Sequence, residues 1–169
     1  MSLLSTIFGK RVDDTVRPLW HRVVEIARER HWYADDGVAD TVSGRFDAIV
    51  LVLALVILRM EREERLIGPS ARLTELFVED MDGQLRQSGV GDLVVGKHVN
   101  KLMGTLGGRL DALRAALPGG EVALVPVLER NMTLIDGADA ASLAREALAL
   151  ARRLERSDGG DLLAAKIAP

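Results

Sequence analysis

Apolar residues recur along most of the chain at the spacing of α-helices rather than strands. The longest stripe runs from Val95 to Leu117, where a valine or leucine recurs every three or four residues. That spacing gathers apolar side chains on one side of a helix. No pair of alternating segments is joined by a hairpin turn, so the pattern predicts an all-α fold. The predicted elements form a compact bundle of about six helices, over residues 14–30, 44–64, 69–88, 92–117, 121–132 and 140–156. For residues 121–132, a helix disturbed by Pro126 and a short extended entry followed by a helix are both open, and we favour mostly helix.

The segment 48–58 is apolar on every side and predicts a buried central helix near residues 44–64. A bilayer-spanning helix needs about 20 apolar residues, and Asp47 and Arg59 end this run too early. Trp32 and Tyr33 lie in a polar linker over residues 31–41. We expect them to plug the core rather than to serve as exposed anchors, because large aromatic side chains are usually buried.

A length of 169 residues predicts one domain, with a terminal segment on each side. Residues 1–12 are expected to be a flexible or amphipathic N-terminus, which either docks on the core or touches a membrane. Residues 13–156 form the helical domain, and residues 157–169 form a C-terminal tail. Within the fourth helix, Gly104 and Gly108 lie four residues apart and predict close packing of a neighbouring helix.

Composition argues against most catalytic chemistry. The chain has no cysteine, which removes thiolate nucleophiles, thiolate metal ligands and disulfides. His21, His31 and His98 are scattered and lack metal-ligand spacing. A formal net charge of −3 provides no general attraction to nucleic acid. We therefore expect no enzyme activity, no cofactor, no metal site and no nucleic-acid partner.

The stretch from Asp80 to Lys101 imitates two ligand-binding motifs. Residues 91–98, GDLVVGKH, nearly fit the phosphate loop, but a helix precedes them and His98 replaces the required Ser or Thr. Residues 80–83, DMDG, resemble the start of a calcium loop, but the glycine at position six and the glutamate at position twelve are missing. The stretch is interpreted as a helix, a glycine turn and a second helix.

Charged residues gather around this turn, and two interpretations are open. They either pair with one another in exposed ion pairs, each worth about 0–1 kcal/mol, or they line the rim of a groove that holds another helix. The sequence physics alone does not separate the two.

Two segments resemble the ubiquinol–cytochrome c chaperone family. The first is ARERHWYADDGVADTVSGRFD at residues 27–47, and the second is FVEDMDGQLRQSGVGDLVVGKHVNKLMGTLGGRLDAL at residues 77–113. The DMD, LR and GVGD elements are the specific part, and the similarity extends from about Val16 to about Asn131. The chain departs from the family pattern after the LR pair, and at His98 and Asn100, where basic residues are common in the family.

This resemblance implies a mostly helical, non-enzymatic chaperone of a bacterial type. It implies binding of newly made cytochrome b and assembly of the ubiquinol–cytochrome c reductase. The expected location is the cytoplasm, with peripheral contact at the cytoplasmic face of the inner membrane. Mitochondrial members of the family also bind the ribosome. We do not expect this of the present chain, because it has fewer basic residues in these segments. The alternative function is a helical adaptor for a soluble partner.

The family motifs also suggest which residues form the polar part of the partner-binding surface. For some of them the alternative is a buried structural network, with Arg45 bound to Asp80 or Asp82. The expected partner-binding residues are Arg45, Asp47, Asp80, Asp82, Arg86, Asp92, Lys97 and Lys101.

Overall fold

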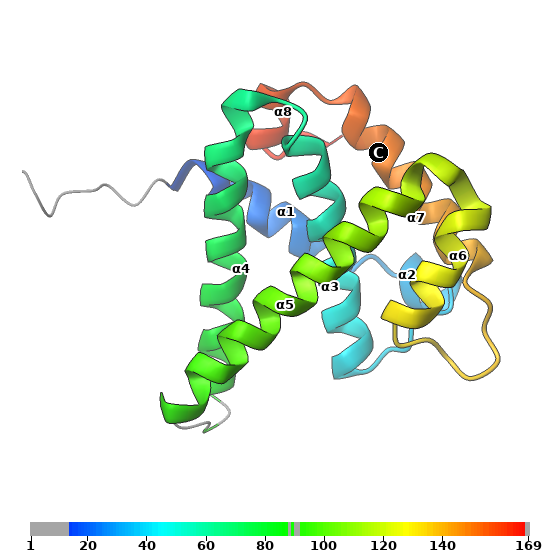
Figure 1. Cartoon of the computed structure of the whole chain (residues 1–169), viewed down its shortest axis with the longest axis horizontal. Helices are drawn as coiled ribbons and strands as arrows, with labels where there is room; N and C mark the ends of the chain where they lie inside the picture. The colour runs from blue at the N-terminus through cyan, green and yellow to red at the C-terminus, as the bar shows by residue number, and fades with distance from the viewer. Residues whose placement is uncertain (1–13, 88, 90–91, 168–169) are drawn as a thin grey trace, which may run out of the picture.

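Helices make up most of the computed structural model, which describes residues 14–87, 89 and 92–167 (Figure 1). Six helices in this part of the chain have 11 to 25 residues, and its one β-type contact is a bridge between Val38 and Leu134. The predicted all-α bundle is confirmed. The helices are α1 (Arg17–Ala27), α2 (His31–Ala34), α3 (Val42–Met60), α4 (Ile67–Gln87), α5 (Asp92–Ala116), α6 (Gly120–Asn131), α7 (Ala141–Arg156) and α8 (Gly159–Leu163), with 3-10 turns η2 (Asp14–Val16), η3 (Glu64–Leu66) and η4 (Leu117–Gly119).

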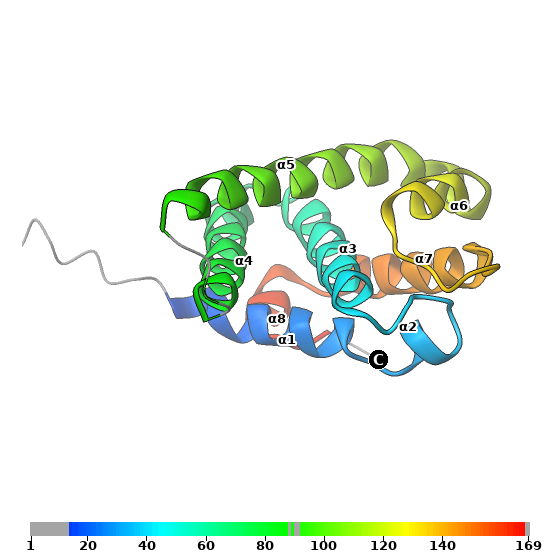
Figure 2. The same cartoon turned by 90° about the horizontal axis from the view of Figure 1, so that it is seen from below.

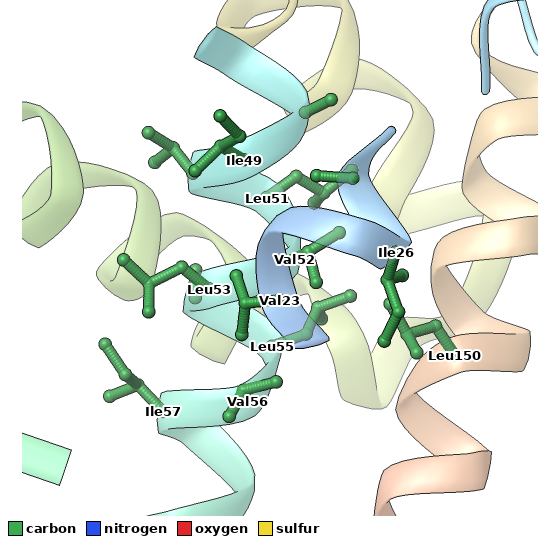
Figure 3. Packing of buried hydrophobic residues seen from close by; sticks show 14 of the residues in the cluster. Val23, Ile26, Ile49, Leu51, Val52, Leu53, Leu55, Val56, Ile57 and Leu150 are labelled. Carbon is green, nitrogen blue, oxygen red and sulfur yellow. The ribbon is translucent and has the colours of Figure 1, made fainter. Parts of the chain in front are cut away.

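α3 is the central helix, as its all-round apolar pattern predicts. Every side chain from Ala48 to Ile57 is buried, and α1, α5 and α7 pack around the helix. Figure 3 shows Val23 of α1 and Leu150 of α7 lying beside the apolar side chains of α3. Among the helices of the described residues, none combines the length and hydropathy needed to cross a bilayer.

The start of α3 is held by a cap and a close backbone contact. The Thr41 hydroxyl accepts a hydrogen bond from the Gly44 amide at 3.1 Å, which satisfies one of the free N–H groups of the first turn. A Cβ atom on Gly44 would lie 1.9 Å from the carbonyl oxygen of Ala39. Only glycine therefore fits at this position.

Two aromatic residues of α2 fix the turn that follows α1. The Trp32 indole donates a hydrogen bond to the carbonyl of Ile26 at 2.7 Å, and the Tyr33 hydroxyl donates to the carbonyl of Ala27 at 2.6 Å. Both carbonyls lie in the last turn of a helix, where intrahelical partners are missing. Trp32 is buried as predicted, whereas α1 ends at Ala27 rather than near Arg30.

α4 and α5 form a helical hairpin whose tip projects away from the bundle (Figure 1). Gly89 lies between the two helices with φ at +83°, a conformation that glycine adopts readily. α5 then crosses the molecule over α3 and leads into α6. Figure 2 shows α5 along one edge of the molecule, with no other helix of the described residues on its outer side.

The end of the chain returns to the N-terminal half. Arg59 of α3 donates hydrogen bonds to the carbonyls of Leu154, at 3.1 Å, and Ser157, at 2.8 Å. Beyond α7, Leu162 and Ile167 are buried, and α8 contacts α1. These residues beyond Arg156 thus pack as part of the bundle.

Candidate partner-binding surfaces

The residues predicted to bind a partner fall into two separate regions. Arg45 and Asp47 lie in the first turns of α3, and the others lie at the tip of the α4–α5 hairpin. Asp47 contacts Arg109, which is 12 residues beyond Lys97 on α5. At 1.5 Å per residue, that corresponds to about 18 Å along the helix. The structure therefore does not bring all the predicted residues into one site.

Asp47 is buried and belongs to an internal network. One carboxylate oxygen accepts a hydrogen bond from Arg109 of α5. The other accepts from the Thr133 amide at 2.8 Å and from the Thr133 hydroxyl at 2.6 Å. The side chains of Asp47 and Arg109 are only 9% and 12% exposed. Asp47 therefore joins α3, α5 and the loop after α6.

Arg45 is exposed and pairs with Asp40 rather than with the acidic residues of α4. Its Nε atom lies 2.6 Å from a carboxylate oxygen of Asp40. The hydrogen bond from Arg45 lowers the pKa of Asp40, and Asp40 in turn raises the pKa of Arg45. The alternative interpretation, a buried network of Arg45 with Asp80 or Asp82, is therefore wrong.

The tip of the hairpin carries most of the other predicted residues, and we call it the charged corner: Asp80, Asp82, Arg86, Lys97 and Lys101. Arg86 forms an ion pair with Asp82 at 2.9 Å, and Asp80 is exposed. Lys97 and Lys101 are also exposed and take part in no ion pair with a described residue. α5 begins at Asp92, but the side chain of Asp92 lies outside the described part of the structure.

The two imitated motifs do not have the geometry of loops. Asp80, Asp82 and Gly83 lie inside α4, which continues to Gln87. Residues 92–98 are the first two turns of α5. Helical backbone does not wrap around a cation or a phosphate as the two motifs require.

One side of α5, which we call the α5 face, is uncovered. Lys97, Lys101, Gly104 and Gly108 follow one another at helical spacing and are all exposed. Apart from the nearby backbone of α5 itself, a Cβ atom on Gly104 or Gly108 would meet no described atom within 4 Å. Among the described residues, therefore, no helix makes the close packing that was predicted for these glycines. Their small size leaves the backbone of α5 accessible from outside.

A groove at the far end of α5 was not predicted from the sequence. This apolar groove has a volume of about 720 Å³ and lies between the ends of α3 and α5 and the middle of α7. Its apolar lining includes Leu58, Leu117 and Leu148. Its rim consists largely of ion pairs, Arg114 with Glu61 at 2.8 Å and Arg62 with Glu155 at 3.0 Å.

A second hollow lies where the α1–α2 turn faces the start of α3. This arginine cleft has a volume of about 460 Å³. Only Arg45 was predicted among the residues that line it. The lining residues are Arg28, Arg30, Tyr33, Ala34, Asp40 and Arg45.

One cluster contains the residue types of a hydrolase triad but not their arrangement. The buried Asp36 accepts a hydrogen bond from Ser142 at 2.6 Å and lies 2.9 Å from His31. The other ring nitrogen of His31 lies 3.1 Å from Glu29. In a triad the histidine lies between the serine and the aspartate and accepts the serine proton. Here the aspartate lies between them, which links α2 to α7 without activating Ser142.

The chain has relatives among known protein families and structures. The family model described as "Ubiquinol-cytochrome C chaperone" matches residues 34–168. The crystal structure of the Cbp3 homolog from Brucella abortus is similar, with a TM-score of 0.80 and 29% sequence identity. That match covers 98% of this chain and 93% of the other. No curated protein matches the chain.

Proposed function

The chain belongs to the ubiquinol–cytochrome c chaperone family, and from this we propose that it binds newly made cytochrome b and promotes assembly of the ubiquinol–cytochrome c reductase. It acts by holding the client rather than by catalysis. The observation that carries the proposal is the uncovered α5 face, which begins at the charged corner and ends beside the apolar groove.

The α5 face suits a helical client for a steric reason. Helices of membrane proteins pack closely where small residues let the two backbones approach. Gly104 and Gly108 provide such a place at the surface of this protein. A client helix that has not yet found its final neighbours packs against this part of α5.

The two ends of α5 suit different parts of the same client. Lys97 and Lys101 have no ion-pair partner among the described residues, so they are available to acidic groups in a client loop. At the other end, Leu117 and Leu148 of the apolar groove remove apolar client surface from water. Burial of apolar surface is worth roughly 25 cal/mol per Å² before the costs of association.

Bulky residues on the α5 face test the proposal. The double variant Gly104→Leu and Gly108→Leu remains folded, because its new side chains point into open space and leucine favours helix over glycine. It should lose most co-purification with cytochrome b. Gly68→Leu is the matched control, because Gly68 is also exposed and helical but lies near the start of α4.

A photo-crosslinking residue at position 97 identifies the partner directly. In membranes that synthesise cytochrome b, it should form a crosslink to that protein, whereas the same residue at position 68 should not. A crosslink that persists to one soluble protein in cells without the reductase would instead establish the adaptor function. Capture of cytochrome b that is unchanged in the double leucine variant would place the client on another surface.

A further inference from the structure

The arginine cleft has an excess of positive charge that its own carboxylate does not neutralise. Three arginines and one aspartate line it, which leaves two positive charges in excess. Asp40 is engaged by Arg45. Arg28 and Arg30 are exposed, and their side chains have no hydrogen-bond or ion-pair partner among the described residues. Two guanidinium groups are therefore available to an anion.

The backbone around the cleft is fixed in advance. The hydrogen bond from Tyr33 to the carbonyl of Ala27 anchors the turn that carries Arg28 and Arg30. Capping of α3 by Thr41 fixes the helix turn that carries Arg45. Burial raises the pKa of Tyr33 above its ordinary value of 10.0, and the neutral hydroxyl donates this hydrogen bond. An anion can thus bind without first ordering these segments.

An exposed apolar side chain lies next to the cleft. Val42 is 89% exposed and precedes Arg45 by three residues in the first turn of α3, a spacing that places the two side chains side by side. A basic site with an apolar neighbour is the combination that binds the boundary between lipid headgroups and acyl chains. A free inorganic anion has no apolar part that could contact Val42, whereas a phospholipid has acyl chains.

We propose that the arginine cleft binds the phosphate group of an anionic phospholipid and holds the chaperone at the membrane surface. Guanidinium groups match phosphate oxygens because they donate paired hydrogen bonds in a fixed plane. The choice of a lipid rather than free phosphate rests on Val42 and on the proposed function, since a chaperone for a membrane protein works beside a bilayer. The binding itself requires no client.

Vesicle flotation with the purified full-length protein tests this inference separately from client binding. The protein should float with phosphatidylglycerol-containing vesicles and remain behind with phosphatidylcholine vesicles. The double variant Arg28→Gln and Arg30→Gln should bind the anionic vesicles roughly tenfold or more weakly, because each arginine contributes to attraction by an anionic surface. The double variant Arg152→Gln and Arg156→Gln removes the same charge from α7 and should bind as the wild type does.

A variant that binds anionic vesicles more tightly cannot be explained by damage to the fold, so it identifies a specific site. Asp40→Asn removes the acidic side chain from the cleft and should tighten binding to anionic vesicles. Equal binding by wild type and the Arg28→Gln and Arg30→Gln variant would overturn the proposal. So would complete displacement from vesicles by millimolar inorganic phosphate, which would indicate a free-anion site. Binding of a single-stranded RNA through Arg28 and Arg30, without preference among vesicles, would assign the cleft to nucleic acid and also overturn it.

Discussion

Two aspartate–arginine pairs in this molecule have the same chemistry and different surroundings. Asp47 and Arg109 are separated by 62 residues, and their side chains are 9% and 12% exposed. Asp82 and Arg86 are one helical turn apart, and their side chains are 23% and 52% exposed. The first pair fixes three segments in the interior, whereas the second remains accessible to a partner. The burial of each pair, rather than its chemistry, thus separates an internal structural link from a surface pair.

Removal of the buried carboxylate should have the largest effect. Asp47→Ala leaves the Arg109 guanidinium largely buried without its charge partner and removes the acceptor for Thr133. We expect a loss of about 3–5 kcal/mol in the free energy of unfolding, the range for a buried pair that loses one partner. Urea unfolding followed by circular dichroism measures it.

The double variant Asp47→Ala and Arg109→Met is the control for this assignment. It removes the stranded charge, so it should recover part of the lost stability. A stability loss below about 1 kcal/mol in Asp47→Ala would show that the interior pair behaves like a surface pair. The contrast between the two regions would then disappear.

Substitutions at the charged corner should weaken binding of the proposed client more than they lower the free energy of unfolding. Asp82→Asn combined with Arg86→Gln should lower the free energy of unfolding by about 1 kcal/mol or less, since exposed pairs contribute little. Capture of cytochrome b should weaken because the polar contacts at the tip of the hairpin change. Melting curves and client co-purification, compared in one preparation, separate the two effects. A variant that unfolds would make this pair structural too.

Loss of the exposed ion pair between Asp40 and Arg45 should have the smallest effect. We expect it to change the pKa of Asp40 rather than to lower the free energy of unfolding measurably. The hydrogen bond from Arg45 holds the pKa of Asp40 below its usual value of 3.8. The stabilisation is therefore present above that value and is lost as the pH falls through the lowered pKa. Carbon-detected NMR should find the pKa of Asp40 below 3.8 in the wild type and higher in Arg45→Gln. Identical values would show that the ion pair does not form in solution.

Local sequence was sufficient to predict where the helices lie along the chain, but not which segments pack against them. The cap at Thr41 and the glycine turn at Gly89 act within one turn of chain, so the helix ends near them were predictable. The uncovered side of Gly104 and Gly108 was not predictable, because it depends on the path of helices elsewhere in the chain. Small residues permit close packing, but they do not determine whether the neighbour belongs to the same molecule.

The site was only partly predictable for the same reason. Asp47 directly precedes the apolar run that begins at Ala48, and this position was a sign that its carboxylate would be buried. Nothing in the sequence near Arg109 indicates its contact with Asp47. The arginine cleft and the apolar groove each combine segments from different parts of the chain, so neither has a local motif.

The position of α3 has a consequence for how the protein is made. α3 ends at Met60, but α7, which covers part of it, begins only at Ala141. At roughly 5–20 residues per second, the ribosome needs about 4–16 seconds to synthesise the residues between them. During that interval the most apolar helix of the protein has only part of its final covering. This chaperone is thus itself prone to aggregation while it is being synthesised, and slower translation of α5 to α7 should lower its yield.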